Sequence, residues 1–109
     1  MPEYVLVTTT APDRKTADAI AKKLVEARSA ACVQIVGPIT SNYTWEEAIE
    51  TSEEWLLLVK APAAAYERIE ALIRQAHPYQ IPEIAAVPVS RGSSAYLSWI
   101  DQVTATTGG

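Results

Sequence analysis

The stretch Ala30–Trp45 reads Ala-Ala-Cys-Val-Gln-Ile-Val-Gly-Pro-Ile-Thr-Ser-Asn-Tyr-Thr-Trp, and its pattern decides the fold. Its β-branched and aromatic residues indicate an extended strand. Gly37-Pro38 predicts a bulge or bend inside this strand, not its end, because a period of two resumes from Ile39 to Trp45. A second extended run follows at about Glu50–Ala61. The two runs predict a hairpin whose strands are much longer than the usual length of about five or six residues. Such a hairpin must project beyond its own sheet.

Tyr4–Thr10, near the start of the chain, is an apolar and β-branched run that predicts a buried, central strand. Ala11-Pro12-Asp13 closes this run, and Asp13 is a candidate N-cap for the helix that follows. The apolar residues of this helix recur at helical spacing, which predicts a helix lying on a sheet. They are Ala17, Ile20, Ala21, Leu24 and Val25.

The second half of the chain predicts another helix and a fourth strand. Pro62 opens the helix, which ends at His77-Pro78 because proline disfavours the α conformation in the residue before it. Ile84–Val89 predicts the strand, and Pro88 favours an edge position or a bulge. The apolar face of the second helix comprises Ala65, Ile69, Leu72, Ile73 and Ala76.

A short last helix, capped by Ser93 or Ser94, completes a β-α-β-β-α-β order, and Thr104–Gly109 is expected to fray. This order predicts one α+β domain over residues 1–109, a ferredoxin-like sandwich in which two helices cover one face of an antiparallel sheet. The other face lacks a covering layer, and its apolar residues are expected to include Leu6, Cys32 or Val33, and Leu57. A long apolar hairpin with open edges aggregates unless it is paired. We therefore expect self-association, most simply as a ring in which each hairpin extends the sheet of the next subunit.

The composition excludes several classes of protein. A formal net charge of -4 argues against a protein that binds nucleic acid through a basic face. No apolar run approaches the roughly 20 residues of a membrane span, and Met1-Pro2-Glu3 lacks the basic start of a secretion signal. A single cysteine cannot form an internal disulfide, which favours a reducing compartment. We therefore expect a cytoplasmic protein that binds neither nucleic acid nor membranes.

Ala76–Ile84 reads Ala-His-Pro-Tyr-Gln-Ile-Pro-Glu-Ile and gathers the only histidine, a tyrosine, two prolines and a carboxylate. The prolines fix their own φ angles and push His77 and Ile81 toward extended geometry. The side chains of His77, Tyr79 and Glu83 are therefore held in nearly fixed directions, as is common in binding loops.

Several segments together resemble the CutA family of divalent-cation tolerance proteins, and the resemblance runs from about Tyr4 to Val103. The most specific are His77-Pro78-Tyr79-Gln80-Ile81-Pro82-Glu83-Ile84 and, downstream, Tyr96-Leu97-Ser98-Trp99. The resemblance implies a cytoplasmic homotrimer, related in architecture to the PII nitrogen-signalling trimers and associated with tolerance to copper and other divalent ions. The tip of the hairpin departs from the family, because Trp45-Glu46-Glu47-Ala48 stands where relatives usually have Trp-x-Gly-Lys. The remaining matching segments are Ala31-Cys32-Val33, Ser41-Asn42-Tyr43-Thr44-Trp45 and Leu57-Leu58-Val59-Lys60.

Metal binding has several candidate residues. Copper ligands proposed in some family members match Thr9, Ala76 and His77, of which only His77 is a ligand type. Its imidazole suits copper or zinc, and the alternative is that it donates to the last carbonyls of the second helix. Cys32 offers a thiolate or is an inert buried thiol, and Glu83 offers a carboxylate. One chain lacks the three or four ligands of a closed metal site, so a tight site must be shared between subunits. We expect that folding requires no metal. A set of acidic residues has two interpretations: it forms weak, oxygen-rich sites for hard metal ions, or it is simply a solvated charged face. These residues are Asp13, Glu46, Glu47, Glu50, Glu53 and Glu54.

A second kind of site is expected where subunits meet. Tyr43 and Trp45 share one face of the long strand, and the proline-fixed Tyr79 and Glu83 are expected to approach a neighbouring subunit's strand end. In the family that the chain resembles, this neighbourhood forms clefts between subunits. A cleft with aromatic walls, one ammonium and one carboxylate suits a small anionic or zwitterionic ligand, and the alternative is that these residues only hold the interface together. The candidate residues are Tyr43, Trp45, Lys60, Tyr79, Glu83 and Trp99.

Catalysis is not expected. Nothing in the spacing brings Cys32 and His77 together as nucleophile and base, and the sequence has no glycine-rich phosphate loop and no HExxH or GxSxG motif. The favoured function is a non-enzymatic, trimeric tolerance protein that binds copper or another divalent ion weakly. The alternatives are a PII-like signalling trimer that binds a small metabolite in its cleft, and a trimeric anchor for another protein.

Overall fold

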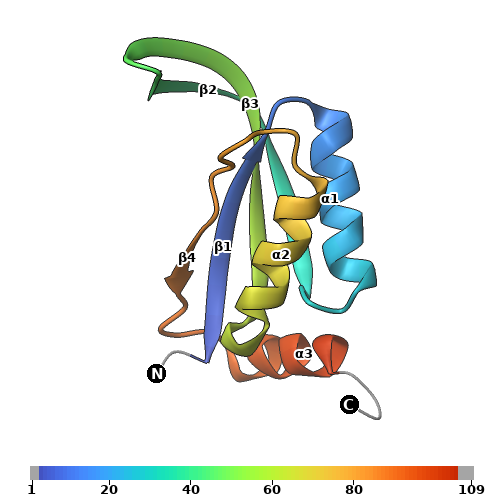
Figure 1. The fold of residues 1–109 in the computed structure, drawn as a ribbon. Coiled ribbons are helices and arrows are strands. Elements are labelled where there is room, and N and C mark those ends of the chain that lie inside the picture. Colours follow the sequence, from blue (N-terminus) through green and yellow to red (C-terminus); the bar gives the residue numbers. More distant parts are fainter. Residues whose placement is uncertain (1–2, 106–109) are drawn as a thin grey trace.

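The computed structural model of the chain describes residues 3–105. Within these residues, four strands and three α-helices follow the predicted β-α-β-β-α-β order with one further helix, so the α+β class is confirmed (Figure 1). The elements are β1 (Tyr4–Ala11), α1 (Arg14–Glu26), β2 (Cys32–Trp45), β3 (Ala48–Pro62), the 3-10 turn η1 (Ala63–Ala65), α2 (Tyr66–Ala76), β4 (Ala85–Pro88) and α3 (Ser94–Thr104).

One antiparallel sheet joins the strands in the order β2-β3-β1-β4. β1 pairs with β3 on one side and with β4 on the other, which confirms the central position predicted for Tyr4–Thr10. β4 lies at an edge, as Pro88 predicts, and is shorter than the predicted Ile84–Val89. β2 forms the other edge, so the described part of the chain has two open sheet edges.

α1 and α2 lie over one face of the sheet, as expected (Figure 1). The Asp13 Oδ1 atom caps α1 by accepting a hydrogen bond from the Thr16 N–H at 2.7 Å. Val25 was placed on the apolar face that lies on the sheet, and this was wrong: Val25 is 44% exposed, because α1 meets the sheet through other residues. The core between helices and sheet includes Val5, Val7, Ala17, Ile20, Leu24, Leu57, Val59, Ile69 and Ile73.

α2 begins later than predicted, at Tyr66, because Pro62 is followed by the η1 turn. It ends at Ala76, as predicted, since His77 precedes a proline and takes extended backbone angles of φ -90° and ψ 134°. The chain therefore leaves the helix abruptly and turns back toward β1.

The register between β1 and β3 decides which side chains of β3 lie beneath the helices. Leu57 lies opposite Thr9 and Val59 lies opposite Val7, and all four are fully buried. The expectation that Leu57 lies on the uncovered face was therefore wrong, because odd-numbered residues of β3 point toward the helices. Its even-numbered residues take the uncovered face instead.

Among the described residues, the second face of the sheet has no helical layer like that of α1 and α2. α3 lies at the end of the sheet opposite the hairpin (Figure 1). Of the two alternatives left by the sequence, Cys32 lies on this face and Val33 packs against the core. Val36 is 46% exposed and Val87 is 52% exposed. An apolar surface of this kind is typical of an interface with another chain. We call it the open face; its apolar residues are Leu6, Cys32, Val36, Leu56, Leu58 and Val87.

The β2–β3 hairpin bends away from the sheet and extends beyond it, as predicted (Figure 1). A bulge at Gly37-Pro38, whose peptide bond is cis, shifts the pairing by one residue between Val36 and Ile39. After this shift, odd-numbered residues of β2 take the side that its even-numbered residues hold before it. The bulge therefore places Tyr43 and Trp45 on the same side as the open face.

The hairpin tip turns through Glu46 and Glu47, whose φ angles of 49° and 70° both lie in the left-handed region. Trp45 pairs with Ala48 across this two-residue turn. The geometry is typical of a type I′ turn, in which Asn-Gly is the favoured pair.

Changing the tip to Asn-Gly (Glu46→Asn with Glu47→Gly) is expected to raise the free energy of unfolding by about 1–2 kcal/mol, because asparagine and glycine adopt positive φ at lower cost. Denaturant unfolding followed by circular dichroism measures the change. Glu53→Gln removes an exposed charge from β3 without altering the turn and is the control. A double variant no more stable than this control would rule out strain at the tip.

α3 begins after Ser93, whose Oγ atom accepts a hydrogen bond from the Tyr96 N–H at 3.2 Å. The Tyr4 hydroxyl donates to Asp101 at 2.6 Å and joins α3 to β1. Thr104, expected to begin the frayed tail, is instead buried in the last turn of α3, and residues 106–109 of the predicted tail lie outside the described residues. No helix in residues 3–105 is both long enough and apolar enough to cross a membrane.

Candidate functional site

His77 follows α2 and is buried, with 8% of its surface exposed. Its Nε2 atom donates to the Thr10 carbonyl of β1 at 2.5 Å, and its Nδ1 atom accepts from the Tyr79 N–H at 3.1 Å. A carbonyl only accepts and an N–H only donates, so these contacts fix the neutral ring with its proton on Nε2. The alternative in which His77 donates to the last carbonyls of α2 was therefore wrong. The ring ties the loop after α2 to β1.

Tyr79 is held at both ends of its side chain. Its ring packs against the His77 ring, with centroids 4.7 Å apart, and its hydroxyl donates to the Glu54 Oε2 atom of β3 at 3.0 Å. Glu54 is only 6% exposed. Burial, the hydrogen bond from Tyr79 and the negative charge of Glu54 together raise the pKa of Tyr79 to about 12. The phenol is therefore a fixed hydrogen-bond donor at neutral pH.

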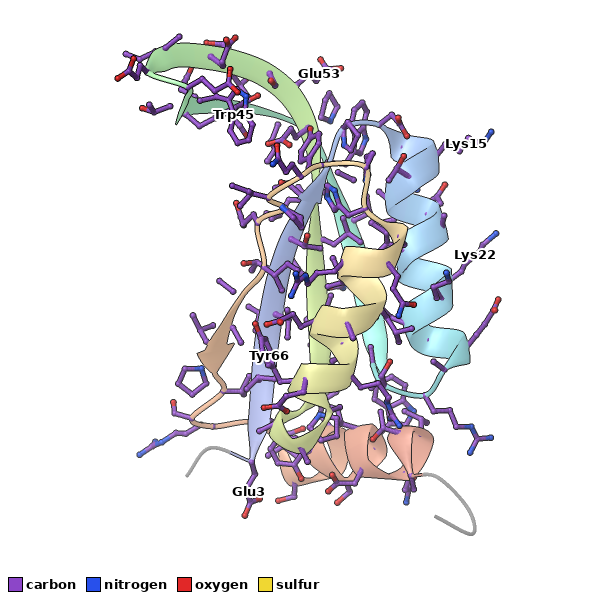
Figure 2. All side chains as sticks on the ribbon, in the orientation of Figure 1. Glu3, Lys15, Lys22, Trp45, Glu53 and Tyr66 are labelled. Atoms are coloured by element: carbon purple, nitrogen blue, oxygen red, sulfur yellow. The ribbon has the colours of Figure 1, made fainter. Side chains whose placement is uncertain are left out.

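A groove of about 780 Å³ lies between the bent hairpin and the Tyr79–Glu83 loop. The inner side of the hairpin forms one wall, and Figure 2 shows Trp45 on this inner side. The Tyr43 hydroxyl forms a hydrogen bond of 2.7 Å with the Ser52 hydroxyl, which fixes its ring. The lining contains two carboxylates and neither lysine nor arginine. Four of the predicted cleft residues line it, namely Tyr43, Trp45, Tyr79 and Glu83.

Lys60 and Trp99 lie elsewhere in the subunit. Lys60 is on the open face, where its Nζ atom donates to the Gln34 side-chain oxygen. Trp99 is on α3 and stacks on Tyr96, with ring centroids 5.9 Å apart. The ammonium group predicted for the cleft is therefore absent from the groove of one subunit, which is acidic and aromatic.

The candidate metal ligands are spread over the subunit. Cys32 lies at the start of β2, His77 contacts Thr10 near the bend of the hairpin, and Glu83 is on the groove loop. Within residues 3–105, no three His, Cys, Asp or Glu side chains lie close enough together to hold a metal ion. A metal at either nitrogen of His77 must displace a backbone hydrogen bond. Metal binding by these three residues stays a prediction.

Glu54 is the site residue whose position the sequence interpretation missed, because it was treated as one member of an acidic cluster. Glu54 is an even-numbered residue of β3, like Leu56 and Leu58 next to it, so its side chain lies on the same side of the strand as theirs. This parity was the available signal that Glu54 lies on the same side of the hairpin as Tyr43 and Trp45. The other glutamates of the cluster are exposed; they are Glu46, Glu47, Glu50 and Glu53.

The raised pKa of Tyr79 predicts a loss of stability at alkaline pH. The protonated phenol contributes its full stabilisation below the ordinary pKa of 10.0, and this contribution is lost as the pH rises toward about 12. Tyr79→Phe is expected to unfold with a shallower pH dependence in this window. A titration of tyrosinate absorbance should lose one late-ionising group in the variant. Loss of a group that ionises near pH 10 instead would contradict the assignment.

Comparison with known proteins identifies the family. Residues 5–103 match the family model of the CutA1 divalent ion tolerance protein. The chain belongs to the CutA family. The divalent-cation tolerance protein CutA of Thermus thermophilus is 42% identical over 104 residues, which cover 95% of this chain and 99% of that protein. Protein CutA of Mus musculus is 40% identical over 95 residues, which cover 87% of this chain and 54% of the mouse protein. The crystal structure of CutA from Xylella fastidiosa superimposes with a TM-score of 0.92 at 37% identity, covering 94% of this chain and 99% of that one.

The match confirms the resemblance carried by the loop at Ala76–Ile84 and by the hairpin. All residues that line the groove fall inside the matched range. The names of the family model and of the Thermus thermophilus protein describe tolerance to divalent cations, and none of the names reported above describes an enzymatic reaction. The particular metal, the number of subunits and the cellular compartment stay predictions for this chain.

Proposed function

We propose that the protein is a homotrimeric, non-enzymatic divalent-cation tolerance protein of the CutA type, which works in the cytoplasm and binds copper or another divalent ion weakly. The observation that carries the proposal is an open face in a chain that belongs to this family. A single subunit leaves Val36 and Val87 about half exposed and has two open sheet edges. In a PII-like trimer, each hairpin extends the sheet of the next subunit and the open faces cover one another.

Weak metal binding fits the distribution of ligands. A copper or zinc site needs three or four ligands, and the described residues of one chain gather no such set. A metal ion held by His77, Cys32 or Glu83 must therefore take its other ligands from solvent or from a neighbouring subunit. Few fixed ligands predict low affinity.

Calorimetric titration of Cu²⁺ and Zn²⁺ into the full chain tests metal binding. We expect weak binding that EDTA abolishes and that Glu83→Gln reduces, because this variant removes an exposed carboxylate without breaking a packing contact. Glu53→Gln, on the outer side of the hairpin, is the matched control and should bind like the wild type. A wild-type titration with only the heat of dilution would refute metal binding, and isotherms of a folded His77→Ala variant identical to wild type would remove His77 from the site.

The surroundings of His77 and Cys32 support a protein without catalytic chemistry. Backbone groups take both nitrogens of His77, which leaves neither free to accept a proton from a nucleophile. Cys32 lies on the open face, away from the groove.

The groove favours a second candidate function, a PII-like signalling trimer that binds a small metabolite. Its volume of about 780 Å³ falls within the usual range of small-molecule sites. A thermal-shift experiment distinguishes metal tolerance from metabolite signalling. A metabolite should raise the melting temperature equally with and without EDTA, whereas the effect of a metal ion should vanish with the chelator.

A further inference from the structure

We propose that the groove between the hairpin and the Tyr79–Glu83 loop binds an organic ammonium ion with an aliphatic body. The inference deepens the second candidate function and rests on the groove being a ligand site. It differs from the anionic or zwitterionic ligand expected from the sequence, because Lys60 does not line the groove of the subunit.

Glu54 carries the charge argument. It is 6% exposed and lines the groove, and its Oε2 atom accepts the hydrogen bond from the Tyr79 hydroxyl. Among the described residues, no hydrogen bond reaches its Oε1 atom and no salt bridge reaches its carboxylate. Because the residue is mostly buried while its Oε1 atom stays open to the groove, a cation there would supply the positive partner that the carboxylate lacks.

Three aromatic side chains suit the same cation. Tyr43, Trp45 and Tyr79 line the groove and are 41%, 38% and 37% exposed in a single subunit, so each offers ring surface to a ligand there. Aromatic ring faces attract organic cations, and cages of several rings recognise substituted ammonium groups. The hydrogen bonds of Tyr43 to Ser52 and of Tyr79 to Glu54 hold two of the rings in place without a ligand.

The size and the far wall of the groove favour a molecule larger than a metal ion. About 780 Å³ is far more than a single ion fills. Ile81 is 71% exposed and lines the groove beside Pro82, so it offers apolar contact to an aliphatic chain. Glu83 on the same loop supplies a second carboxylate. A short alkyl diammonium ion matches both the charges and the apolar wall.

Calorimetric titration of putrescine into the full chain, in the presence of EDTA, tests the proposal. We expect binding by the wild type and none of 1,4-butanediol, which has a similar length without charge. Glu54→Gln should weaken putrescine binding at least about tenfold, because it removes the buried charge that the ammonium pairs with. Glu53→Gln is the matched control, since Glu53 lies on the outer side of the bent hairpin and Trp45 on the inner side (Figure 2). It should bind putrescine like the wild type.

Trp45→Ala provides a second variant in case Glu54→Gln disturbs the fold. It removes an exposed ring, should leave circular dichroism unchanged, and should also weaken putrescine binding. Wild-type protein that binds no putrescine would overturn the inference, as would Glu54→Gln with wild-type affinity. Binding of succinate in place of putrescine would overturn the cationic class but keep the groove as a metabolite site. A further outcome is that neither putrescine nor succinate binds. The double variant Trp55→Phe/Trp99→Phe leaves Trp45 as the only tryptophan, so acrylamide quenching then reports on Trp45 alone. If Trp45 is shielded from the quencher, a second copy of the chain fills the groove and the inference is overturned. The Cu²⁺ and Zn²⁺ titrations test metal binding by the proposed tolerance protein, and their result does not depend on whether putrescine binds.

Discussion

His77→Ala is expected to lower the free energy of unfolding by about 3 kcal/mol. The ring bonds the Thr10 carbonyl at 2.5 Å and the Tyr79 N–H at 3.1 Å, and the variant leaves both groups without these partners. Each buried polar group that loses its partner costs about 1–3 kcal/mol, and the vacated ring adds a cavity beneath the loop. Urea unfolding at neutral pH, followed by circular dichroism, measures the loss.

Gln75→Ala is the matched control, because Gln75 is exposed at the same end of α2. It should change the free energy of unfolding by less than about 0.5 kcal/mol. EDTA should leave wild-type unfolding unchanged, because His77 supports the fold through the backbone and not through a metal. A His77→Ala variant as stable as the control would show that the ring does not anchor the loop.

Leu58→Glu is expected to convert the proposed trimer into monomers at micromolar concentration. Leu58 lies in the middle of the open face, opposite Thr8 of β1 and Gln34 of β2. In the proposed trimer, the variant buries a carboxylate without a positive partner in each of the subunits, and each such burial costs several kcal/mol, roughly. Sedimentation velocity measures the shift from trimer to monomer.

Val25→Glu is the control for this experiment, because it places the same charge on the helix-covered side, where Val25 is already 44% exposed. It should sediment like the wild type. Circular dichroism identifies any unfolding of Leu58→Glu, and Val87→Glu at the edge strand β4 tests the same face with a more exposed side chain. Folded Leu58→Glu that sediments with the control would place the interface elsewhere.

Local chemistry made several features of the fold predictable. Asp13 caps α1, Pro78 ends α2 and Gly37-Pro38 forms a bulge, because each effect depends on residues adjacent in sequence. Gly37 is also required by a contact that the sequence does not reveal: a Cβ atom there would lie 2.5 Å from the Trp55 Cδ1 atom.

The face taken by each residue of β3 was less predictable. Trp55–Val59 is a continuous apolar run, so it lacks the alternation that separates a buried face from an exposed one. Only the pairing of Leu57 with Thr9 shows that Leu57 lies beneath the helices. Val25 was misplaced for a related reason, since an apolar residue at the margin of a helix face is buried only where the neighbouring elements reach it.

Part of the candidate site followed from spacing and part depended on tertiary structure. The period of two predicted that Tyr43 and Trp45 share a face, and the prolines predicted a fixed loop at Tyr79 and Glu83. Glu54 joins them because the hairpin bends over this loop; the Gly37-Pro38 bulge predicts a bend, but the sequence does not reveal that the loop lies beneath it. Lys60 does not line the groove of one subunit, which is why we propose a cationic ligand in place of the anionic or zwitterionic ligand expected from the sequence.

Sedimentation equilibrium of the wild-type chain at micromolar concentration tests whether the open face is covered by further copies of the same chain. We expect one species with three times the 11.8 kDa mass of the chain. A stable, well-behaved species of 11.8 kDa would contradict the trimer and remove the basis for a metal site shared between subunits.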